Sequence, residues 1–191
     1  MTDIPTPGRR LRDALAAEHP LQVAGVIHAY AAMQAEQAGF RALYVSGAGV
    51  ANASHGLPDL GMTSLVDGLT DVRRITAATR LPVLVDADTG WGGACHIART
   101  VRERIRAGAA GLHLVAQVAA QRGGPRPGNP RGGAGERADR RRAPVEARPD
   151  PHFVIMARTD ALAVEGLDGA LARAGIYRDA GADMLFPEAV T

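Results

Sequence analysis

An Ala-Gly pair recurs three times at the same point of a repeating pattern. It ends a helix-like stretch and precedes a short apolar run at Ala38-Gly39, Ala107-Gly108 and Ala180-Gly181. Glycine just after the last helical residue is a common helix stop, and a short apolar run between turn residues is typical of a buried strand. The repeated helix-to-strand junction therefore predicts an α/β fold built on a parallel sheet.

The pattern predicts six strands and the helices between them. Strands are expected at residues 21–27, 42–45, 82–85, 111–115, 153–157 and 184–186, and helices at 9–17, 29–38, 71–79, 94–107 and 167–180. The helix at 94–107 has the clearest amphipathic pattern, with Ile97, Val101 and Ile105 on one face. Thr70 is the predicted N-cap of the helix at 71–79.

Two α/β architectures compete for this pattern. A Rossmann fold is disfavoured, because no G-x-G-x-x-G motif opens a helix after the first strand. A (β/α)₈ barrel of the TIM type typically needs ~250 residues, and this chain has 191. We therefore predict one domain over 1–191, a TIM-type barrel truncated to about six βα units whose first and sixth strands have unpaired edges.

Composition excludes several classes of protein. The chain has a single cysteine, Cys95, so a disulfide framework is impossible within it, and we expect Cys95 to be a packing residue. No apolar run approaches the ~20 residues that span a bilayer. The beginning of the chain shows no secretory signal. The expected setting is the cytoplasm, without a membrane partner.

One segment departs from the pattern. Residues 121–149 contain eight Arg, six Gly and five Pro, and this composition predicts that they cannot bury enough apolar area to order themselves. The segment accounts for the basic pI of about 9.2. It contains no aromatic residue that could stack on bases, so a nucleic-acid partner is disfavoured.

The strongest candidate for chemistry is a pair of acids, Asp86 and Asp88, at the predicted end of the third strand. Residues two apart on a strand point to the same side, so both carboxylates can aim at one point. Carboxylate oxygens suit Mg²⁺, and Asp59, in the loop at 56–61, could support the same ion. The alternative is that one Asp only caps the following helix.

Other polar residues are expected at the same end of the sheet. Ser46, Gly47 and Ala48 form a small-residue turn whose N–H groups can approach an anion. Arg158 could clamp a carboxylate, with Glu188 near it. Together these predict a site for a small di- or tricarboxylate. The alternatives are an ordinary turn at Ser46 and a structural Arg158–Glu188 ion pair. His113, on the strand at 111–115, could face the same site, but a lone histidine on a strand is more often a hydrogen-bonded core residue.

Six motifs, taken together, resemble the methylisocitrate lyase family of the isocitrate lyase and phosphoenolpyruvate mutase superfamily. They lie at residues 46–50, 56–59, 85–90, 107–113, 154–163 and 186–189. The resemblance implies a (β/α)₈ barrel, Mg²⁺, a homotetramer, and cleavage of 2-methylisocitrate to pyruvate and succinate in propionate breakdown. It implies that the metal is held by Asp86 and Asp88 with Asp59, and the substrate by Ser46, Gly47, Ala48, Gly124, Arg158 and Glu188.

The chain departs from this family at the catalytic loop, which carries the cysteine that donates a proton, and at an acidic pair on the fourth strand. The family's mobile Lys-Arg-Cys-Gly-His loop reads Gln-Arg-Gly-Gly-Pro here, so Gly123 stands at the position of the catalytic cysteine. The family's Glu-Asp pair on the fourth strand reads Val115-Ala116. No catalytic residue is therefore intact. We expect an impaired lyase, or a non-catalytic remnant that binds Mg²⁺ and carboxylates or only associates with homologues.

Overall fold

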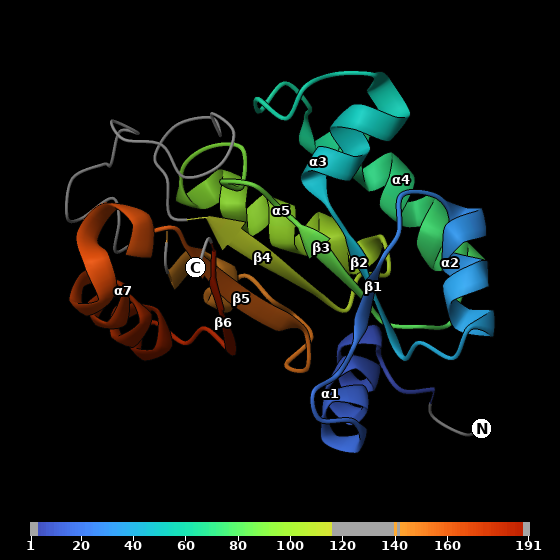
Figure 1. Cartoon of the computed structure of the whole chain (residues 1–191), viewed down its shortest axis with the longest axis horizontal. Coiled ribbons are helices and arrows are strands. Elements are labelled where there is room, and N and C mark those ends of the chain that lie inside the picture. The colour runs from blue at the N-terminus through green and yellow to red at the C-terminus, as the bar shows by residue number, and fades with distance from the viewer. Residues whose placement is uncertain (1–3, 116–139, 141, 189–191) are drawn as a thin grey trace.

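The computed structural model describes residues 4–115, 140 and 142–188. Its centre is one sheet in which six strands follow each other in chain order, every neighbouring pair parallel (Figure 1). The strands are β1 (Val23–Gly25), β2 (Ala42–Val45), β3 (Val83–Asp86), β4 (Gly111–Val115), β5 (Val154–Thr159) and β6 (Met184–Pro187). The sheet is curved, with β1 and β6 at the two ends of the order. The predicted α/β class and incomplete barrel are confirmed.

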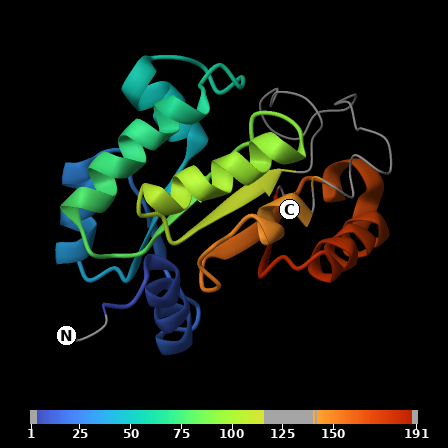
Figure 2. The same ribbon diagram turned by 180° about the vertical axis from the view of Figure 1, so that it is seen from behind.

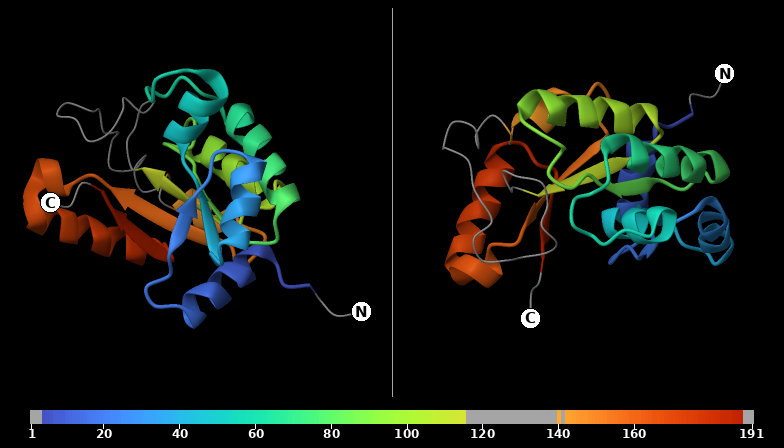
Figure 3. Two further views of the ribbon diagram at one scale, coloured as in Figure 1. Left: turned by 45° about the vertical axis from the view of Figure 1, so that its right-hand side comes forward. Right: turned by 90° about the horizontal axis from the view of Figure 1, so that it is seen from above.

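Helices cover the outer face of this sheet (Figures 2 and 3). They are α2 (Ala29–Gln37), α4 (Leu65–Ala78), α5 (Ala94–Arg106) and α7 (Leu162–Asp179). The short α3 (Gly47–Gly49) and the π-helical turn η1 (Val50–Ser54) follow β2 and lie beyond its carboxyl end (Figure 1). Residues 142–146 form a further helical turn. None of the helices within the described ranges is both long and apolar enough to cross a bilayer.

The main core lies between the strands and these helices. Every second residue of β2 and β3 points outward, and Leu43, Val45, Val83 and Val85 are all at most 1% exposed. They belong to one apolar cluster with buried residues of α4 and α5, among them Leu69, Val72, Ile75 and Val101. The amphipathic pattern predicted for 94–107 is confirmed, since Ile97 and Val101 are buried there.

The first helix, α1 (Pro7–Ala17), lies across the amino ends of the strands (Figure 1). Its Leu11 packs in a small apolar cluster with Ala42, Ala110 and Val154, which lie at the beginnings of strands or just before them. A Cβ on Gly8 would lie 2.5 Å from the carbonyl carbon of His152. Only glycine allows this approach, so α1 seals the amino ends of the strands and leaves their carboxyl ends for the site.

The predicted beginning of α4 was wrong. The helix begins six residues before Asp71, at Leu65, and its N-cap is Ser64. The Ser64 backbone N–H donates to the Asp67 carboxylate at 2.8 Å, and the Asp67 N–H donates to Ser64 Oγ at 3.4 Å. Thr70, predicted as the cap, lies inside the helix and donates its hydroxyl to the Val66 carbonyl. The sequence feature that marks the beginning of this helix is the reciprocal cap of Ser64 and Asp67. It was overlooked because Gly68 and Thr70 follow it and are not typical of a helix interior.

Three further expectations need correction. The turn at 142–146 shows that part of the segment 121–149 is ordered, because Ala143 and Ala147 are buried and Val145 packs on the main core. The helix predicted at 167–180 begins earlier, and its first turn is separated by a kink at Gly166, where φ is 71°. Cys95 is exposed rather than packed.

An ionic cluster joins α1 to the far end of the chain. The Asp183 carboxylate accepts hydrogen bonds from the Ile155 N–H at 2.9 Å and from Arg12 Nη2 at 2.7 Å, and it also pairs with Arg148. Arg12 donates in addition to the His152 carbonyl at 3.0 Å. Burial raises the pKa of Asp183, but the Ile155 hydrogen bond and the two guanidinium groups outweigh it and hold the pKa below its usual range.

Asp183→Asn should lower the free energy of unfolding by about 2 kcal/mol, because charge-assisted hydrogen bonds to partly buried groups are lost. Since the folded pKa is depressed, this stabilisation is present above the unfolded-state pKa of about 3.9 and is lost as pH falls through the folded value. Urea unfolding at pH 7 and pH 3 checks both points. Asp179→Asn, at an exposed Arg178 pair, is the matched control and should change little. Equal effects of the two variants would contradict the prediction.

Candidate functional site

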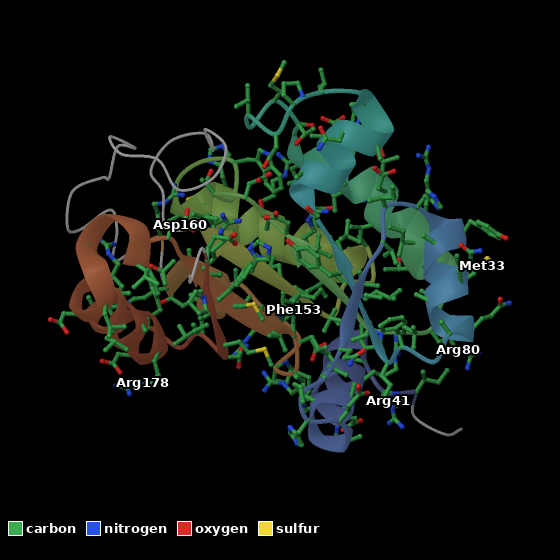
Figure 4. The ribbon with its side chains drawn as sticks, viewed as in Figure 1. Met33, Arg41, Arg80, Phe153, Asp160 and Arg178 are labelled. Atoms are coloured by element: carbon green, nitrogen blue, oxygen red, sulfur yellow. The ribbon has the colours of Figure 1, made fainter. Side chains whose placement is uncertain are left out.

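Polar side chains gather where the parallel strands end. In Figure 4, Asp160, which follows β5, lies at this end of the sheet, whereas Arg41 and Arg80, which precede β2 and β3, lie at the other. The carboxyl ends of parallel strands are the usual place for active sites in α/β barrels. Because α1 seals the amino ends, the candidate site can be open only at this edge.

Asp86 and Asp88 flank the same point beside Gly47. Asp86 is the last residue of β3, and Asp88 has already left the strand, with φ at 47°. A Cβ built on Gly47 would lie 3.1 Å from Asp86 Oδ2 and 3.3 Å from Asp88 Oδ1. The two carboxylates therefore come together, but through a left-handed turn rather than through the strand alternation that the sequence suggested.

Hydrogen bonds fix the Asp86 carboxylate. Its Oδ2 accepts the Gly47 N–H at 3.2 Å, and its Oδ1 accepts the Asp88 N–H at 2.9 Å. Asp86 and Asp88 are each 7% exposed. Neither acid caps α5, because the N-cap of that helix is Gly93 and no side chain caps it. The capping alternative therefore does not account for these residues.

Two of the acids, Asp88 and Asp59, have raised pKa values. Burial, followed by the charges of Asp86 and Asp59, raises the pKa of Asp88 to about 7. Burial and the Asp86 charge also raise the pKa of Asp59 above its usual value. Asp59 thus lies within electrostatic reach of the pair. Since nearby negative charge raises the pKa of both Asp88 and Asp59, a positive ion would be stabilised here.

Tyr44 and His113 line the inner face next to Asp86. The Tyr44 hydroxyl lies 2.8 Å from His113 Nε2, which is itself 3.5 Å from Asp86 Oδ1. The imidazole stacks on Tyr44 at 5.7 Å between ring centroids and meets the edge of Phe186 at 5.3 Å. Burial lowers the pKa of His113, and burial together with Asp86 raises the pKa of Tyr44. At neutral pH both rings are therefore uncharged hydrogen-bonding groups.

Tyr44 and Phe186 were not singled out from the sequence. The available signal was the strand alternation, since Tyr44 stands two residues before Ser46 and Phe186 two before Glu188. For His113 the sequence left two possibilities, a side chain that faces the site or a hydrogen-bonded residue of the core, and the second was favoured. It is fully buried and hydrogen-bonded, but it is also in contact with the site.

Arg158 reaches the site from β5. Its Nε lies 3.1 Å from Asp160 Oδ1 and 3.5 Å from Glu188 Oε2, and its guanidinium carbon lies 5.7 Å from the centre of the Phe186 ring. Burial lowers the pKa of Arg158, but Asp160, Glu188 and Asp86 outweigh it and raise the pKa. The guanidinium is thus a permanent charge at the site, and the predicted contact with Glu188 is present beside a closer one with Asp160.

The small-residue turn follows β2. Ser46 is the N-cap of α3, and its Oγ accepts the Gly49 N–H at 3.3 Å. Gly47 and Ala48 form the first turn of that helix, so their N–H groups are at a helix beginning. Gly47 already donates to Asp86. Gly123 and Gly124 lie outside the described residues, and so does Ala116.

The donor set fits a magnesium ion. Among the residues that the structure describes, no three His, Cys, Asp or Glu side chains form a ready-made metal cluster. Mg²⁺ does not need one, because it usually takes one or two carboxylates and completes its shell with water and substrate oxygens. The space beside Gly47, which a single Cβ would fill, lies between two carboxylates of this kind.

A buried arginine lies behind the acid pair. Arg104 of α5 is 1% exposed, and its Nη2 lies 3.5 Å from the Asp86 carbonyl oxygen. Burial lowers the pKa of Arg104 to about 10, against the opposing influence of Asp86 and Asp88, so it stays charged at neutral pH. A Cβ on Gly68 of α4 would lie 2.7 Å from Arg104 Nη2. Gly68 therefore provides the space for the guanidinium.

Gly68→Ala should destabilise the protein although alanine favours helices, because the new methyl group would overlap a fully buried guanidinium. Gly175→Ala in α7 is the matched control. It has nothing within 4 Å of its Cβ position and should gain about 1 kcal/mol of helix propensity. Thermal unfolding by circular dichroism compares the two. An equal rise in melting temperature for both variants would show that Gly68 has no such role.

Known proteins resemble the chain over nearly its whole length. The family model described as phosphoenolpyruvate phosphomutase matches residues 11–191. The chain is 59% identical over 184 residues to a 2-methylisocitrate lyase of Shewanella oneidensis, covering 96% of this chain and 63% of that protein. It is 57% identical over 187 residues to a 2-methylisocitrate lyase of Escherichia coli K12, covering 97% of this chain and 63% of that protein.

Solved structures agree with the fold. A crystal structure of 2,3-dimethylmalate lyase, described as a member of the PEP mutase/isocitrate lyase superfamily, has a TM-score of 0.88 at 38% identity, covering 99% of this chain and 64% of that one. Phosphonopyruvate hydrolase in complex with oxalate and Mg²⁺ has a TM-score of 0.81 at 29% identity, covering 96% of this chain and 63% of that one. The chain thus spans just under two thirds of the relatives it matches. It belongs to the phosphoenolpyruvate phosphomutase family, within the superfamily of PEP mutases and isocitrate lyases.

Proposed function

We propose that the chain carries the binding half of a Mg²⁺-dependent carbon–carbon lyase of the 2-methylisocitrate type, with impaired turnover. The observation that carries this proposal is the pair of carboxylates, Asp86 and Asp88, on either side of Gly47 at the carboxyl end of β3. The names of the most similar relatives, 2-methylisocitrate lyases, support the substrate class. A structural neighbour in complex with oxalate and Mg²⁺ supports the ion.

Asp86 and Asp88 would hold the metal, with Asp59 adding negative charge nearby. When bound, Mg²⁺ supplies Lewis acidity toward the carboxylate and hydroxyl oxygens of the substrate half that becomes pyruvate, which favours loss of the hydroxyl proton. The Gly47 N–H and the Asp88 N–H keep the Asp86 carboxylate in place for this task.

Arg158 would bind a substrate carboxylate. Its hydrogen bond to a described residue, Asp160, uses Nε, and the Phe186 ring packs against the guanidinium. A guanidinium oriented in this way suits a carboxylate, which accepts two parallel hydrogen bonds. Ser46, Ala48 and Glu188 complete the proposed substrate side, together with Gly124. The proposed substrate is therefore a small anion with several carboxylates.

The cleavage needs a proton at its end. When the carbon–carbon bond breaks, its electron pair stays on the carbon beside the carboxylate of the departing succinate half, and a proton must be added there. The family uses a cysteine at the position of Gly123, and a glycine cannot donate that proton. Losing a general acid commonly costs ~10²–10⁴-fold in rate. We therefore propose slow turnover with binding retained.

The second candidate is a carboxylate-binding protein without lyase activity. It is favoured by Val115, which is buried at the end of β4 and whose N–H donates to the Asp88 carbonyl at 2.8 Å. The backbone of Val115 is therefore hydrogen-bonded to the acid turn, and its side chain at the position of a family Glu is apolar. Homotetramer formation and a cytoplasmic setting are proposed by the same family resemblance.

Mg²⁺-dependent pyruvate release from 2-methylisocitrate distinguishes the two candidates. The chain should release pyruvate slowly, and Gly123→Cys combined with Val115→Glu and Ala116→Asp should raise the rate by at least tenfold, because both the proton donor and the acidic groups return. Asp13→Asn, on the exposed face of α1, is the control. If neither the parent chain nor the triple variant releases pyruvate, and circular dichroism shows that both are folded, the lyase proposal fails and the carboxylate-binding protein remains.

Gly47→Ala should weaken Mg²⁺ binding by tenfold or more, because its methyl group would occupy the space between the two carboxylates. Gly93→Ala is the matched control, since nothing lies within 4 Å of its Cβ position. Isothermal titration with Mg²⁺ measures both variants. Unchanged binding in Gly47→Ala would place the ion elsewhere and remove the central support of the proposal.

A further inference from the structure

Arg104 is the least expected charge in the molecule. It has the largest of the fully buried side chains among the described residues. It belongs to α5, whose other buried residues are Ile97, Thr100 and Val101. Its Nε and Nη1 have no hydrogen-bond partner within the described part of the chain. A buried guanidinium with unsatisfied N–H groups is costly unless a compensating charge lies close. The reason for keeping it should therefore be found among its neighbours.

The neighbours of Arg104 are the residues of the proposed metal site. A small cavity is lined by Arg104 together with Asp86, Asp88, Gly47 and Ser46. The guanidinium also lies 5.5 Å from the centre of the Trp91 ring, in the turn that follows the acids. No carboxylate within the described residues forms a salt bridge with Arg104, so its charge acts on the pair across this cavity.

We propose that Arg104 is a positioning residue that serves as an internal counter-charge of the Asp86–Asp88 pair and thereby sets its affinity for a divalent cation. The inference rests on the proposed function, because it takes the acid pair as the metal site. With no ion bound, one fixed positive charge behind β3 offsets part of the repulsion between the carboxylates. When a divalent ion binds, the same charge repels it.

The direction of the effect follows from charge alone. The guanidinium is buried and packs against Gly68, the Trp91 ring and the Asp86 carbonyl. A cation placed between the acids therefore experiences this charge through protein rather than through water, where screening is weaker. Removing the charge should tighten cation binding, whereas a residue that is only structural would leave affinity unchanged or weaken it.

Arg104→Met and Arg104→Lys test the proposal as a pair. Methionine keeps an unbranched side chain without the charge, and lysine keeps the charge. Electron paramagnetic resonance of free Mn²⁺ measures binding without using activity, and fluorescence of Trp91, the one tryptophan of the chain, gives a second titration. Arg104→Met should bind Mn²⁺ about tenfold more tightly than the parent chain. Arg104→Lys should remain within about twofold.

The outcomes separate the inference from the proposed function. If the parent chain binds Mn²⁺ and folded Arg104→Met binds no more tightly, the inference fails and the metal site stands. If only Arg104→Met binds, the inference holds and the parent chain is not a metal enzyme. If neither binds, both fail. Should circular dichroism show Arg104→Met unfolded, Arg104→Gln, which is neutral but keeps hydrogen-bond donors, decides by the same criteria.

Discussion

Two carboxylates held against the same glycine are the constraint on which the carboxyl end of this sheet depends. Asp86 and Asp88 are both buried, and the charge of Asp86 helps to raise the pKa of Asp88. Backbone N–H groups fix one of them, and a buried guanidinium behind β3 supplies the nearest fixed positive charge on the helix side. Two glycines make room for this arrangement, because neither has a side chain. Gly47 leaves space beside the carboxylates, and Gly68 leaves space for the guanidinium.

Much of the fold could be predicted from residue patterns, because each helix-to-strand junction repeats the same local chemistry. Strands 42–45 and 111–115 were predicted with their observed bounds. The beginning of α4 was missed because its cap depends on a reciprocal bond between Ser64 and Asp67 rather than on Thr70. Ordering of 142–146 was missed because it depends on burial against the core, which composition does not report.

The candidate site was predictable in part for the same reason. Strand ends identify Asp86, Arg158 and Glu188, since parallel strands bring such residues to one edge. The closeness of Asp88 to Asp86 required a left-handed residue that no pattern signals. Arg104 could not be found at all, because an arginine on an amphipathic helix is ordinarily read as a residue of the solvent-facing side. Its burial follows only from the space that a glycine on the neighbouring helix provides.

The ionic cluster around Asp183 has a consequence for the order in which the molecule is made. Arg12 of α1 is bound by an acid that lies 171 positions further along the chain. A ribosome completes the first five strands before it reaches that acid. The helix that seals the amino ends of the strands therefore lacks this ionic partner until Asp183 has been synthesised, and its docking can be completed only after the fifth strand has been made.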